Sequence, residues 1–457
     1  MKGLSLLTVV ALVGCASSTA GHTTRASRSL EKRALSGPIE TETSRSLRCT
    51  APSTPCPIET AVSITVDRTA SLTNMALGAD GTGFVALRWS TSGAEAVPGG
   101  RGQILEIDRE GGVTGYEDLL PGSMVKTDTA GNPIVISRPF AAVLHVHGWL
   151  DGSYPRTLGP WPRHVLDVDI RGVERLAILD TRLDAEGAPM VLLGHSQSSG
   201  QFPLLLAHAL PTPGGHVEVV DPKPYGGAAA LDVMPDGRPY IVHTTLSGTT
   251  EDATLDLVAG PVGTPPVTVH QRSFREFRVD AVRVLAPTDT EGAILSLVTR
   301  GELHLARVDD GQPRTRELPE LRTVEHDSIP PISGPVRYTN SHPDQHVLLR
   351  NDHGAFIAWL AQDYEYEQSC SEVTTEVGPI MGCDIADNQS RAVVKLAPIL
   401  DDLALGPITT LQFSSMGVST LVGDARGERI ALASMRWNSE RGPEGPAELD
   451  YVVLTTR

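Results

Sequence analysis

The chain has 457 residues, of which 38 are lysine or arginine and 55 are aspartate or glutamate, so its formal net charge is −17. So acidic a protein is expected to bind neither nucleic acid nor anionic lipid through its overall charge. Only 4% of the residues are aromatic, whereas 34 are proline and 44 are glycine, and this composition favours short strands and tight turns over long helices.

The N-terminus has the features of an export signal. Lys2 precedes an apolar run at residues 4–13, which is too short to cross a membrane. The run ends in Leu12-Val13-Gly14-Cys15, which resembles the bacterial lipobox. The resemblance implies a signal peptide at 1–14, acylation of Cys15, and a lipid-anchored protein of the bacterial envelope. Ala16 stands where an inner-membrane retention signal would have aspartate, which favours the outer membrane. The alternative is a secretory signal with an incidental cysteine.

The segment that follows is expected to be a flexible linker. Residues 15–58 are rich in serine, threonine, alanine and arginine and contain few large apolar side chains. The first 58 residues carry a net charge of +4, which leaves −21 for the remainder. The basic linker could contact lipid headgroups, but a solvated linker is the simpler interpretation. We therefore expect the folded domain to cover residues 59–457.

A repeated turn runs through this domain. Each copy has an acidic residue, a glycine shortly after it and then an alternating apolar run. The repeated glycines are separated by 50 to 73 residues, and they are Gly81, Gly131, Gly187, Gly237, Gly292, Gly354 and Gly427. Periods near 50 residues are typical of β-propellers. The sequence predicts a single all-β propeller of about seven four-stranded blades, with six or eight as alternatives, and assigns the acidic residues to the turns rather than to calcium.

The two ends of the domain are predicted to pair with each other. The chain ends in AELDYVVLTTR at 447–457, which fits the third strand of the last blade, and AVSITVD at 61–67 is the candidate for the missing strand. Such a closure removes exposed strand edges.

The largest insertion lies between FIAWLAQDY at 356–364 and AVVKLAPIL at 392–400. We expect an acidic loop, presented on the face opposite the glycine turns, to bind a partner. Four candidate contact residues lie at its base: Tyr364, Glu365, Tyr366 and Glu367. Without Cys15, four cysteines remain, and the short spacings favour disulfides Cys49–Cys56 and Cys370–Cys383. The alternative is a tolerated surface insertion without a binding role.

Two patterns suggest catalysis or metal binding but lack the required context. Gly194-His195-Ser196-Gln197-Ser198 resembles the nucleophile elbow of α/β-hydrolases, but serine stands at 198 where that motif needs glycine, so we place Ser196 at the end of an ordinary blade strand. Several histidines lie on separate predicted strands, and His342–His346 with Asp352 and His353 form one compact group. We expect these side chains to be satisfied by neighbours, and we assign no catalytic residue, metal or other cofactor.

No subfamily of propellers is indicated. The Trp-Asp dipeptide, the sialidase Asp-box and the tyrosine and tryptophan of kelch repeats are missing from the repeats. The sequence therefore predicts a monomeric binding or scaffolding module that recognises a protein, a glycan or a small ligand. The alternative is a hydrolase or lyase that acts on extracellular polysaccharide or peptide with carboxylates in the central channel.

Overall fold

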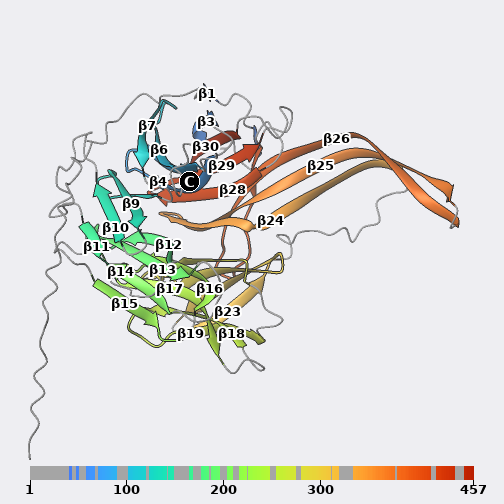
Figure 1. Cartoon of the computed structure of the whole chain (residues 1–457). Helices are drawn as coiled ribbons and strands as arrows, with labels where there is room; N and C mark the ends of the chain where they lie inside the picture. The colour runs from blue at the N-terminus through green and yellow to red at the C-terminus, as the bar shows by residue number, and fades with distance from the viewer. Residues whose placement is uncertain are drawn as a thin grey trace, which may run out of the picture.

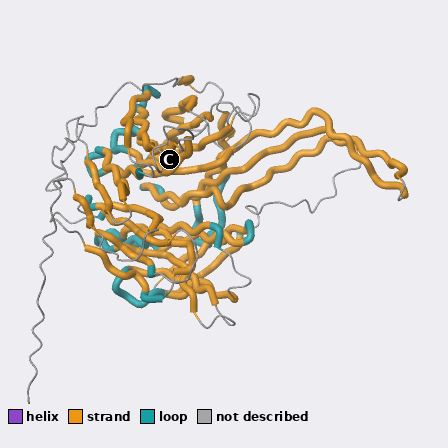
Figure 2. Tube along the Cα trace, in the orientation of Figure 1, coloured by secondary structure: helices purple, strands orange, loops and turns teal. Residues whose placement is uncertain are grey.

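The computed structural model describes residues 41–43, 48–50, 58–66, 70–89, 101–119, 123–140, 143–148, 164–167, 176–184, 187–195, 203–208, 216–223, 225–247, 254–273, 279–309, 311–318, 333–375, 378–412, 418–437 and 447–456. The regular elements in these ranges are β-strands, and Figure 2 shows strands joined by loops. Within the same ranges, no helix is long and apolar enough to cross a membrane.

The described strands form seven antiparallel sheets, which we number along the chain. Sheet 1 contains β4 (Ala70–Leu77), β5 (Gly83–Trp89), β6 (Arg101–Ile107) and β7 (Val113–Leu119). Sheet 2 contains β8 (Met124–Thr127), β9 (Pro133–Phe140), β10 (Val143–Gly148) and β11 (His164–Asp167). Sheet 3 contains β12 (Leu176–Leu183), β13 (Pro189–His195), β14 (Leu204–His208) and β15 (His216–Asp221). Sheet 4 contains β16 (Tyr225–Val233), β17 (Pro239–Ser247), β18 (Thr254–Pro261) and β19 (Val267–Ser273).

The last three sheets follow the same order, and two of them gain strands from the N-terminal region. Sheet 5 contains β20 (Ala281–Leu285), β21 (Ala293–Thr299), β22 (Glu302–Asp309) and β23 (Gln312–Glu317). Sheet 6 contains β24 (Ser333–Asn351), β25 (Gly354–Thr375), β26 (Gly378–Pro398), β27 (Thr409–Gln412) and β2 (Arg48–Thr50). Sheet 7 contains β28 (Val418–Arg426), β29 (Arg429–Trp437), β30 (Ala447–Thr455), β3 (Ile58–Val66) and β1 (Thr41–Thr43).

The sheets are arranged around a closed ring (Figure 1). The first strand of each sheet contacts the first strands of its neighbours, and β28 of sheet 7 contacts β4 of sheet 1. Each described cluster of buried apolar residues joins two successive sheets, as in the cluster that Val62 and Leu449 share with Leu77. Because a sheet in this position is covered on both faces, its second strand is apolar almost throughout, as in AILSLVT of β21. The predicted all-β propeller is confirmed.

Polar side chains also join the inner strands of neighbouring sheets. In each case an aspartate or asparagine on one first strand accepts a hydrogen bond from a backbone N–H of the next sheet. The acceptor and donor residues are Asn74 and Val125 at 3.1 Å, Asp180 and Leu231 at 3.0 Å, Asp232 and Ala286 at 2.7 Å, and Asp424 and Leu77 at 2.8 Å. These bonds satisfy backbone donors that would otherwise be unpaired at the inner edge of a sheet.

Most of the repeated turns have the predicted geometry. Six of the seven glycines have positive φ, and they are Gly81, Gly131, Gly187, Gly237, Gly354 and Gly427. Carboxylates stabilise these turns, because the side chain of Asp128 accepts from the N–H of Asn132 at 2.8 Å and that of Asp184 accepts from Ala188 at 2.7 Å. Gly292 differs: a Cβ placed there would lie 2.1 Å from Oδ1 of Asp309, so a close approach to β22 requires this glycine.

The predicted closure between the two ends of the domain is confirmed. Residues 58–66 of β3 pair with β30 from Leu454 to Ala447 and complete sheet 7. Glu59 of β3 fastens this junction: its carboxylate accepts from Nε of Arg429 at 2.7 Å and Nη2 at 3.1 Å, and it also pairs with Arg109 of sheet 1. The first and last sheets are thus joined by strand pairing and by a shared ion-pair cluster.

Part of the expected linker is attached to the body. β1 pairs with β3, and β2 pairs with β27. Residues 41–43 and 48–50 therefore add outer strands to sheets 7 and 6, so the stretch expected to be wholly flexible up to residue 58 is paired at these two places. The expected signal peptide and Cys15 lie outside the described residues.

Candidate functional site

The predicted binding loop is a three-stranded arm. β24, β25 and β26 extend past the ring into the long projection visible in Figure 1. β24 is described alongside β25 as far as the pair Ser333 and Ser369. Among the described strands, β25 and β26 alone continue from there to the pair Thr375 and Gly378. The expectation of a loop is therefore wrong, although the position of the insertion is as predicted. The inserted residues continue the strands because antiparallel pairing satisfies their backbone N–H and C=O groups without a second sheet packed against them.

The four predicted contact residues lie in the middle strand of this arm. Tyr364 is opposite Tyr338 of β24 and Ser390 of β26. The pairing with β26 shifts register between Glu365 and Glu367, where Tyr366 faces two residues of β26, Asp387 and Asn388, so the bulge lies in β26 opposite Tyr366. The hydroxyl of Tyr364 donates to Oε1 of Gln362 at 2.7 Å, and burial raises its pKa above the usual value. The structure thus brings the predicted residues together on one strand.

The arm has a strongly unbalanced charge. Residues 362–391 contain seven aspartates or glutamates and one basic residue, Arg391. The outer edge of β26 pairs with another described strand only at 393–396, so among the described residues its backbone from 378 to 391 has a neighbour on one side only. An unpaired strand edge can add a strand from another chain. The arm is therefore acidic in composition, and among the described strands one backbone edge of β26 is unpaired from 378 to 391.

The cysteines fit the predicted disulfides as far as they are described. Cys49 and Cys370 are disulfide-bonded. Cys383 lies directly opposite Cys370 in the pairing of β25 with β26, which is the position from which it can close the predicted bond. Cys56 lies outside the described residues, so its pairing with Cys49 stays a prediction.

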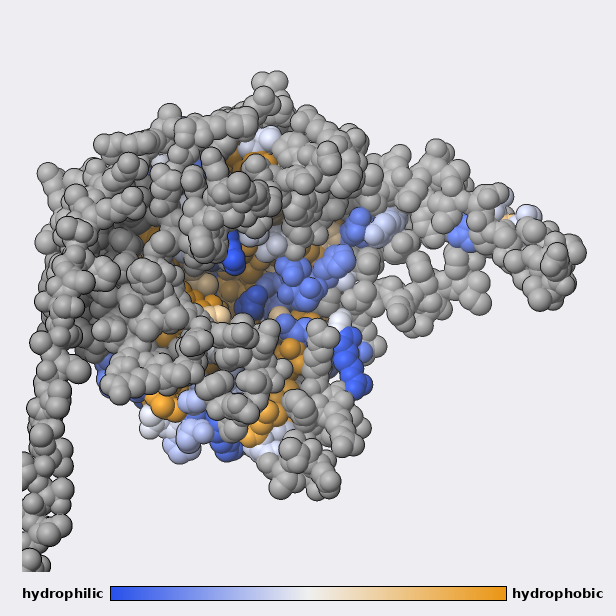
Figure 3. Space-filling view, viewed as in Figure 1, coloured by the Kyte–Doolittle hydropathy of each residue, from blue (hydrophilic) through white to orange (hydrophobic). Residues whose placement is uncertain are grey.

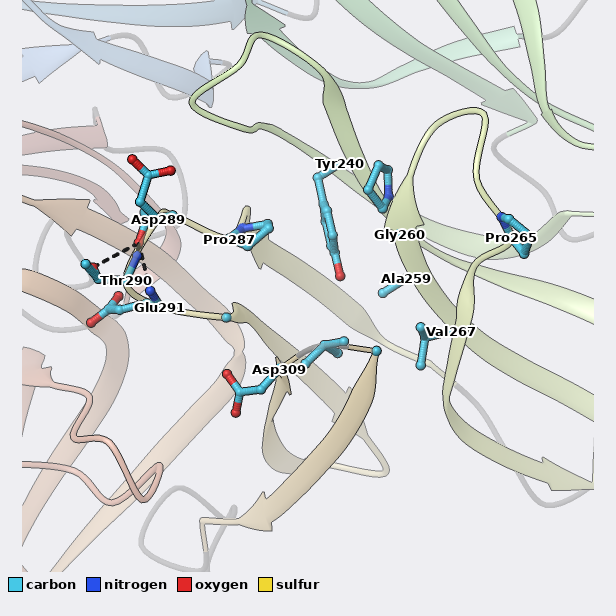
Figure 4. Close-up of a pocket in the computed structure, with 15 residues that line it drawn as sticks. Tyr240, Ala259, Gly260, Pro265, Val267, Pro287, Asp289, Thr290, Glu291 and Asp309 are labelled. Carbon is cyan, nitrogen blue, oxygen red and sulfur yellow. Dashed lines mark hydrogen bonds between the residues drawn. The ribbon is translucent and has the colours of Figure 1, made fainter.

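A pocket of about 420 Å³ lies between sheets 4 and 5 on the face of the glycine turns (Figure 4). Tyr240 forms one wall, and the turn that contains Asp289 and Glu291 forms another. Glu291 is paired with Arg350 at 3.4 Å and Asp309 with Arg307 at 3.2 Å, so two of its carboxylates already have partners. Burial raises the pKa of Tyr240 to about 12. No sequence pattern indicates this pocket, because its walls come from two different sheets.

Two of the described histidines are buried in different sheets and have structural partners. His243 is buried, and its Nε2 lies 3.2 Å from Oδ2 of Asp221; burial lowers its pKa. His346 is fully buried, and its Nε2 lies 2.6 Å from Oγ of Ser296, a bond that joins sheets 5 and 6. His353, by contrast, is exposed in the turn after β24, so the compact group seen in the sequence does not converge. In the described part of the chain, no three metal-binding side chains are grouped to hold an ion.

The serine motif belongs to a propeller sheet. β13 ends at His195 and is the second strand of sheet 3, between β12 and β14. The next described element is β14, whereas a nucleophile elbow leads from a strand into a helix. Gly194 is closely packed, because a Cβ there would lie 2.6 Å from Cδ1 of Leu179, which would have to move. Ser196 itself lies outside the described residues.

Among known proteins, no family profile and no curated protein matches the sequence. One similar solved structure is a subtype N11 neuraminidase-like protein of A/flat-faced bat/Peru/033/2010 (H18N11), with 7% identity, a TM-score of 0.34, and coverage of 90% of this chain and 93% of that one. Another is the xylan β-1,4-xylosidase of Bacillus halodurans C-125, with 10% identity, a TM-score of 0.26, and coverage of 90% and 96%. With TM-scores this low, the likeness assigns no family or activity, and the propeller assignment depends on the strand pairing.

Proposed function

We propose that this protein is an envelope-anchored binding module that engages a partner protein through its acidic arm. The observation that carries the proposal is the arm itself, a projection from sheet 6 with an available strand edge and seven acidic residues against one basic residue. A two-stranded ribbon adds little stability to a folded body. Its length and charge therefore suit contact with another molecule rather than support of the ring.

The partner is a protein with a cationic surface. Opposite charge steers association, and a strand of the partner can pair with the free edge of β26 at 378–391. Tyr364 and Tyr366 lie at the base of the arm, where tyrosine provides large contact area at little cost in side-chain entropy. Acylation at Cys15 would hold the protein at the membrane, and residues 16–40 would provide reach away from it.

The test compares the wild type with three variants of the full chain in a quantitative pull-down from envelope extract. In the short-arm variant, an Asn-Gly turn replaces residues 369–384 and joins Gln368 to Ile385, which are opposite each other in the arm. The charge variant carries Glu365→Gln, Glu367→Gln and Glu372→Gln. The control carries the same number of changes at exposed residues on the turn face, Glu110→Gln, Asp352→Asn and Glu428→Gln.

A basic partner should be retained by the wild type and by the control, lost by the short-arm variant and weakened by the charge variant. The wild-type interaction should also weaken as salt is raised from about 0.05 to 0.5 M, because exposed charges are screened. Equal retention by the wild type and the short-arm variant would refute the arm as the binding element. The anchor has a separate test: Cys15→Ala should abolish fatty-acid labelling and release the protein from the membrane fraction, whereas continued labelling would contradict acylation at this cysteine.

A further inference from the structure

The pocket between sheets 4 and 5 has walls of two chemical kinds. Its apolar walls are formed mainly by three prolines and two valines, Pro261, Pro265, Pro287, Val267 and Val308. Its polar walls include the hydroxyl of Tyr240 and the carboxylates of Asp289, Glu291 and Asp309, and none of the described residues that line it is basic. The surface around β18 and β19, at the bottom of the view in Figure 3, likewise has apolar residues next to hydrophilic ones. Apolar walls with a few polar groups are typical of sites for small molecules.

The hydroxyl of Tyr240 lacks a partner in this pocket. Tyr240 is only 4% exposed, and within the described residues its hydroxyl makes no hydrogen bond. Figure 4 shows its ring reaching between Pro287 and Ala259, with the hydroxyl directed towards the middle of the pocket. Burial raises the pKa of Tyr240 to about 12, so the hydroxyl remains a donor at neutral pH. An enclosed donor without a protein partner favours a ligand that accepts a hydrogen bond from it.

The charges around the pocket nearly cancel. Two of its three carboxylates are paired with arginines: Glu291 with Arg350 at 3.4 Å, and Asp309 with Arg307 at 3.2 Å and Arg314 at 3.6 Å. The remaining carboxylate is exposed and has no ion pair within the described residues. The paired carboxylates are held in place, yet their oxygens keep lone pairs that can accept further hydrogen bonds. A ligand therefore needs hydrogen-bond donors more than it needs a charge.

We propose that this pocket binds a neutral sugar of one or two rings. Tyr240 donates to a sugar oxygen, Asp309 accepts from sugar hydroxyls, and the proline and valine walls pack against the C–H groups of the ring. At about 30 Å³ for each water molecule, the volume of about 420 Å³ equals that of about 14 waters, which is room for such a ligand. The site lies on the face of the glycine turns, so it is independent of the arm and of any partner bound there.

The hydroxyl of Tyr240 has a matched control elsewhere in the ring. Tyr240→Phe removes the hydroxyl and keeps the ring. Tyr225→Phe makes the same change at a tyrosine that is 3% exposed and whose hydroxyl also makes no hydrogen bond within the described residues, but that lies in the core between sheets 3 and 4. A loss of affinity that is confined to Tyr240→Phe therefore reports the pocket and not the general effect of deleting a buried hydroxyl.

The carboxylate of Asp309 is tested in the same way. Asp309→Asn keeps the size of the side chain but replaces one acceptor oxygen by a donor. Its control is Asp402→Asn, because Asp402 is also paired with an arginine, Arg316 at 3.2 Å, but does not line the pocket.

Binding to the full chain is measured by isothermal titration calorimetry with glucose, galactose, xylose, N-acetylglucosamine, cellobiose and maltose. Glucuronate and cadaverine serve as an anionic and a cationic probe. At least one neutral sugar should bind at a single site to the wild type and to both controls, and more tightly than either charged probe. Tyr240→Phe and Asp309→Asn should each weaken that sugar by about tenfold. The short-arm variant should bind it as the wild type does, so this test and that of the arm succeed or fail separately.

A folding defect is separated from a binding defect by thermal unfolding of each variant with and without the same sugar. The sugar should raise the unfolding midpoint of the wild type and of Tyr225→Phe by more than that of Tyr240→Phe. Absence of saturable binding of all six neutral sugars to the wild type up to about 50 mM would overturn the proposal. Unchanged affinity in both folded pocket variants, or tighter binding of a charged probe than of every neutral sugar, would overturn it as well.

Discussion

The closure of the ring and the end of the arm are both antiparallel pairings, but they are stabilised in different ways. In the closure, β3 pairs with β30 and its side chains Val62, Ile64 and Val66 are buried between sheets 7 and 1. In the arm, β25 and β26 beyond Ser369 pair only with each other among the described strands. The closure is therefore held by burial and the arm by backbone pairing and a disulfide. The ring therefore supplies most of the stability, and the end of the arm contributes little to it.

The largest expected effect comes from truncating an isoleucine in each region. Ile64 is fully buried in the closure, so Ile64→Ala should cost about 2–5 kcal/mol of unfolding free energy through lost burial and a cavity. The matched change Ile380→Ala, opposite Val373 in the two-stranded part of the arm, should cost less than about 1 kcal/mol. Denaturant unfolding of both variants measures the difference. Equal losses of unfolding free energy in the two variants would show that the arm contributes as much to stability as the closure.

The next effect concerns Lys126 of β8, on an inner strand of the ring. Burial, followed by the charge of Arg182, lowers the pKa of Lys126 to about 8, so the unfolded chain binds a proton more tightly than the folded one. Wild-type stability should therefore rise as pH increases from about 8 to 10.5, by up to roughly 3 kcal/mol. Lys126→Met should lack this rise and exceed the wild type in stability at pH 7. Unfolding curves that remain parallel for the two proteins across this range would contradict the assignment.

A smaller effect is expected at the ion-pair cluster of the closure. Hydrogen bonds from Arg429, together with Arg109, lower the pKa of Glu59 below its usual value. The stabilisation is present above the ordinary value near 4.5 and is lost as pH falls through the lowered folded pKa. Glu59→Gln should cost about 1 kcal/mol at pH 7. The difference in unfolding free energy between this variant and the wild type should disappear in acid. A difference that stays constant from pH 7 to pH 3 would show that the charge of Glu59 is not its cause.

The smallest effect on stability should come from the disulfide of the arm. Replacing Cys370 and Cys383 together by serine should change the unfolding midpoint by less than about 2 °C, because the two-stranded ribbon lies outside the buried clusters. Amide hydrogen exchange should nevertheless accelerate in residues 365–390. A large fall in the unfolding midpoint would show instead that the arm is coupled to the core of the ring.

Much of the fold was predictable because the repeat is local in sequence. The turn glycines, the alternating strands and the pairing of residues 61–67 with the C-terminus all follow from patterns within single segments. Gly292 departs from the pattern because its turn needs space beside Asp309 rather than positive φ. The arm was mistaken for a loop, although Tyr364 and Tyr366 at a spacing of two, with valines and threonines beyond, are typical of a strand.

The bonds between inner strands of neighbouring sheets could not be predicted in the same way, because they combine side chains and backbone groups from different repeats. A signal was nevertheless present. Several first strands carry a charged residue inside an otherwise apolar run before the turn, as at Asp180, Asp232, Arg283 and Asp424. These residues stand seven, five, nine and three positions before the glycine of their repeat, so they share an odd spacing but not one position. Which groups they contact is a spatial fact that only the structure supplies.

The most direct test of the arm as the functional element is site-specific photo-crosslinking in intact cells. A photoreactive amino acid is placed at Tyr366 or Met381 in the arm and, as a control, at Val219, which is 52% exposed on the outer strand of sheet 3. The account predicts a discrete crosslinked protein from the arm positions and none from Val219. Crosslinks to the same protein from all three positions, or crosslinks from Val219 alone, would contradict it.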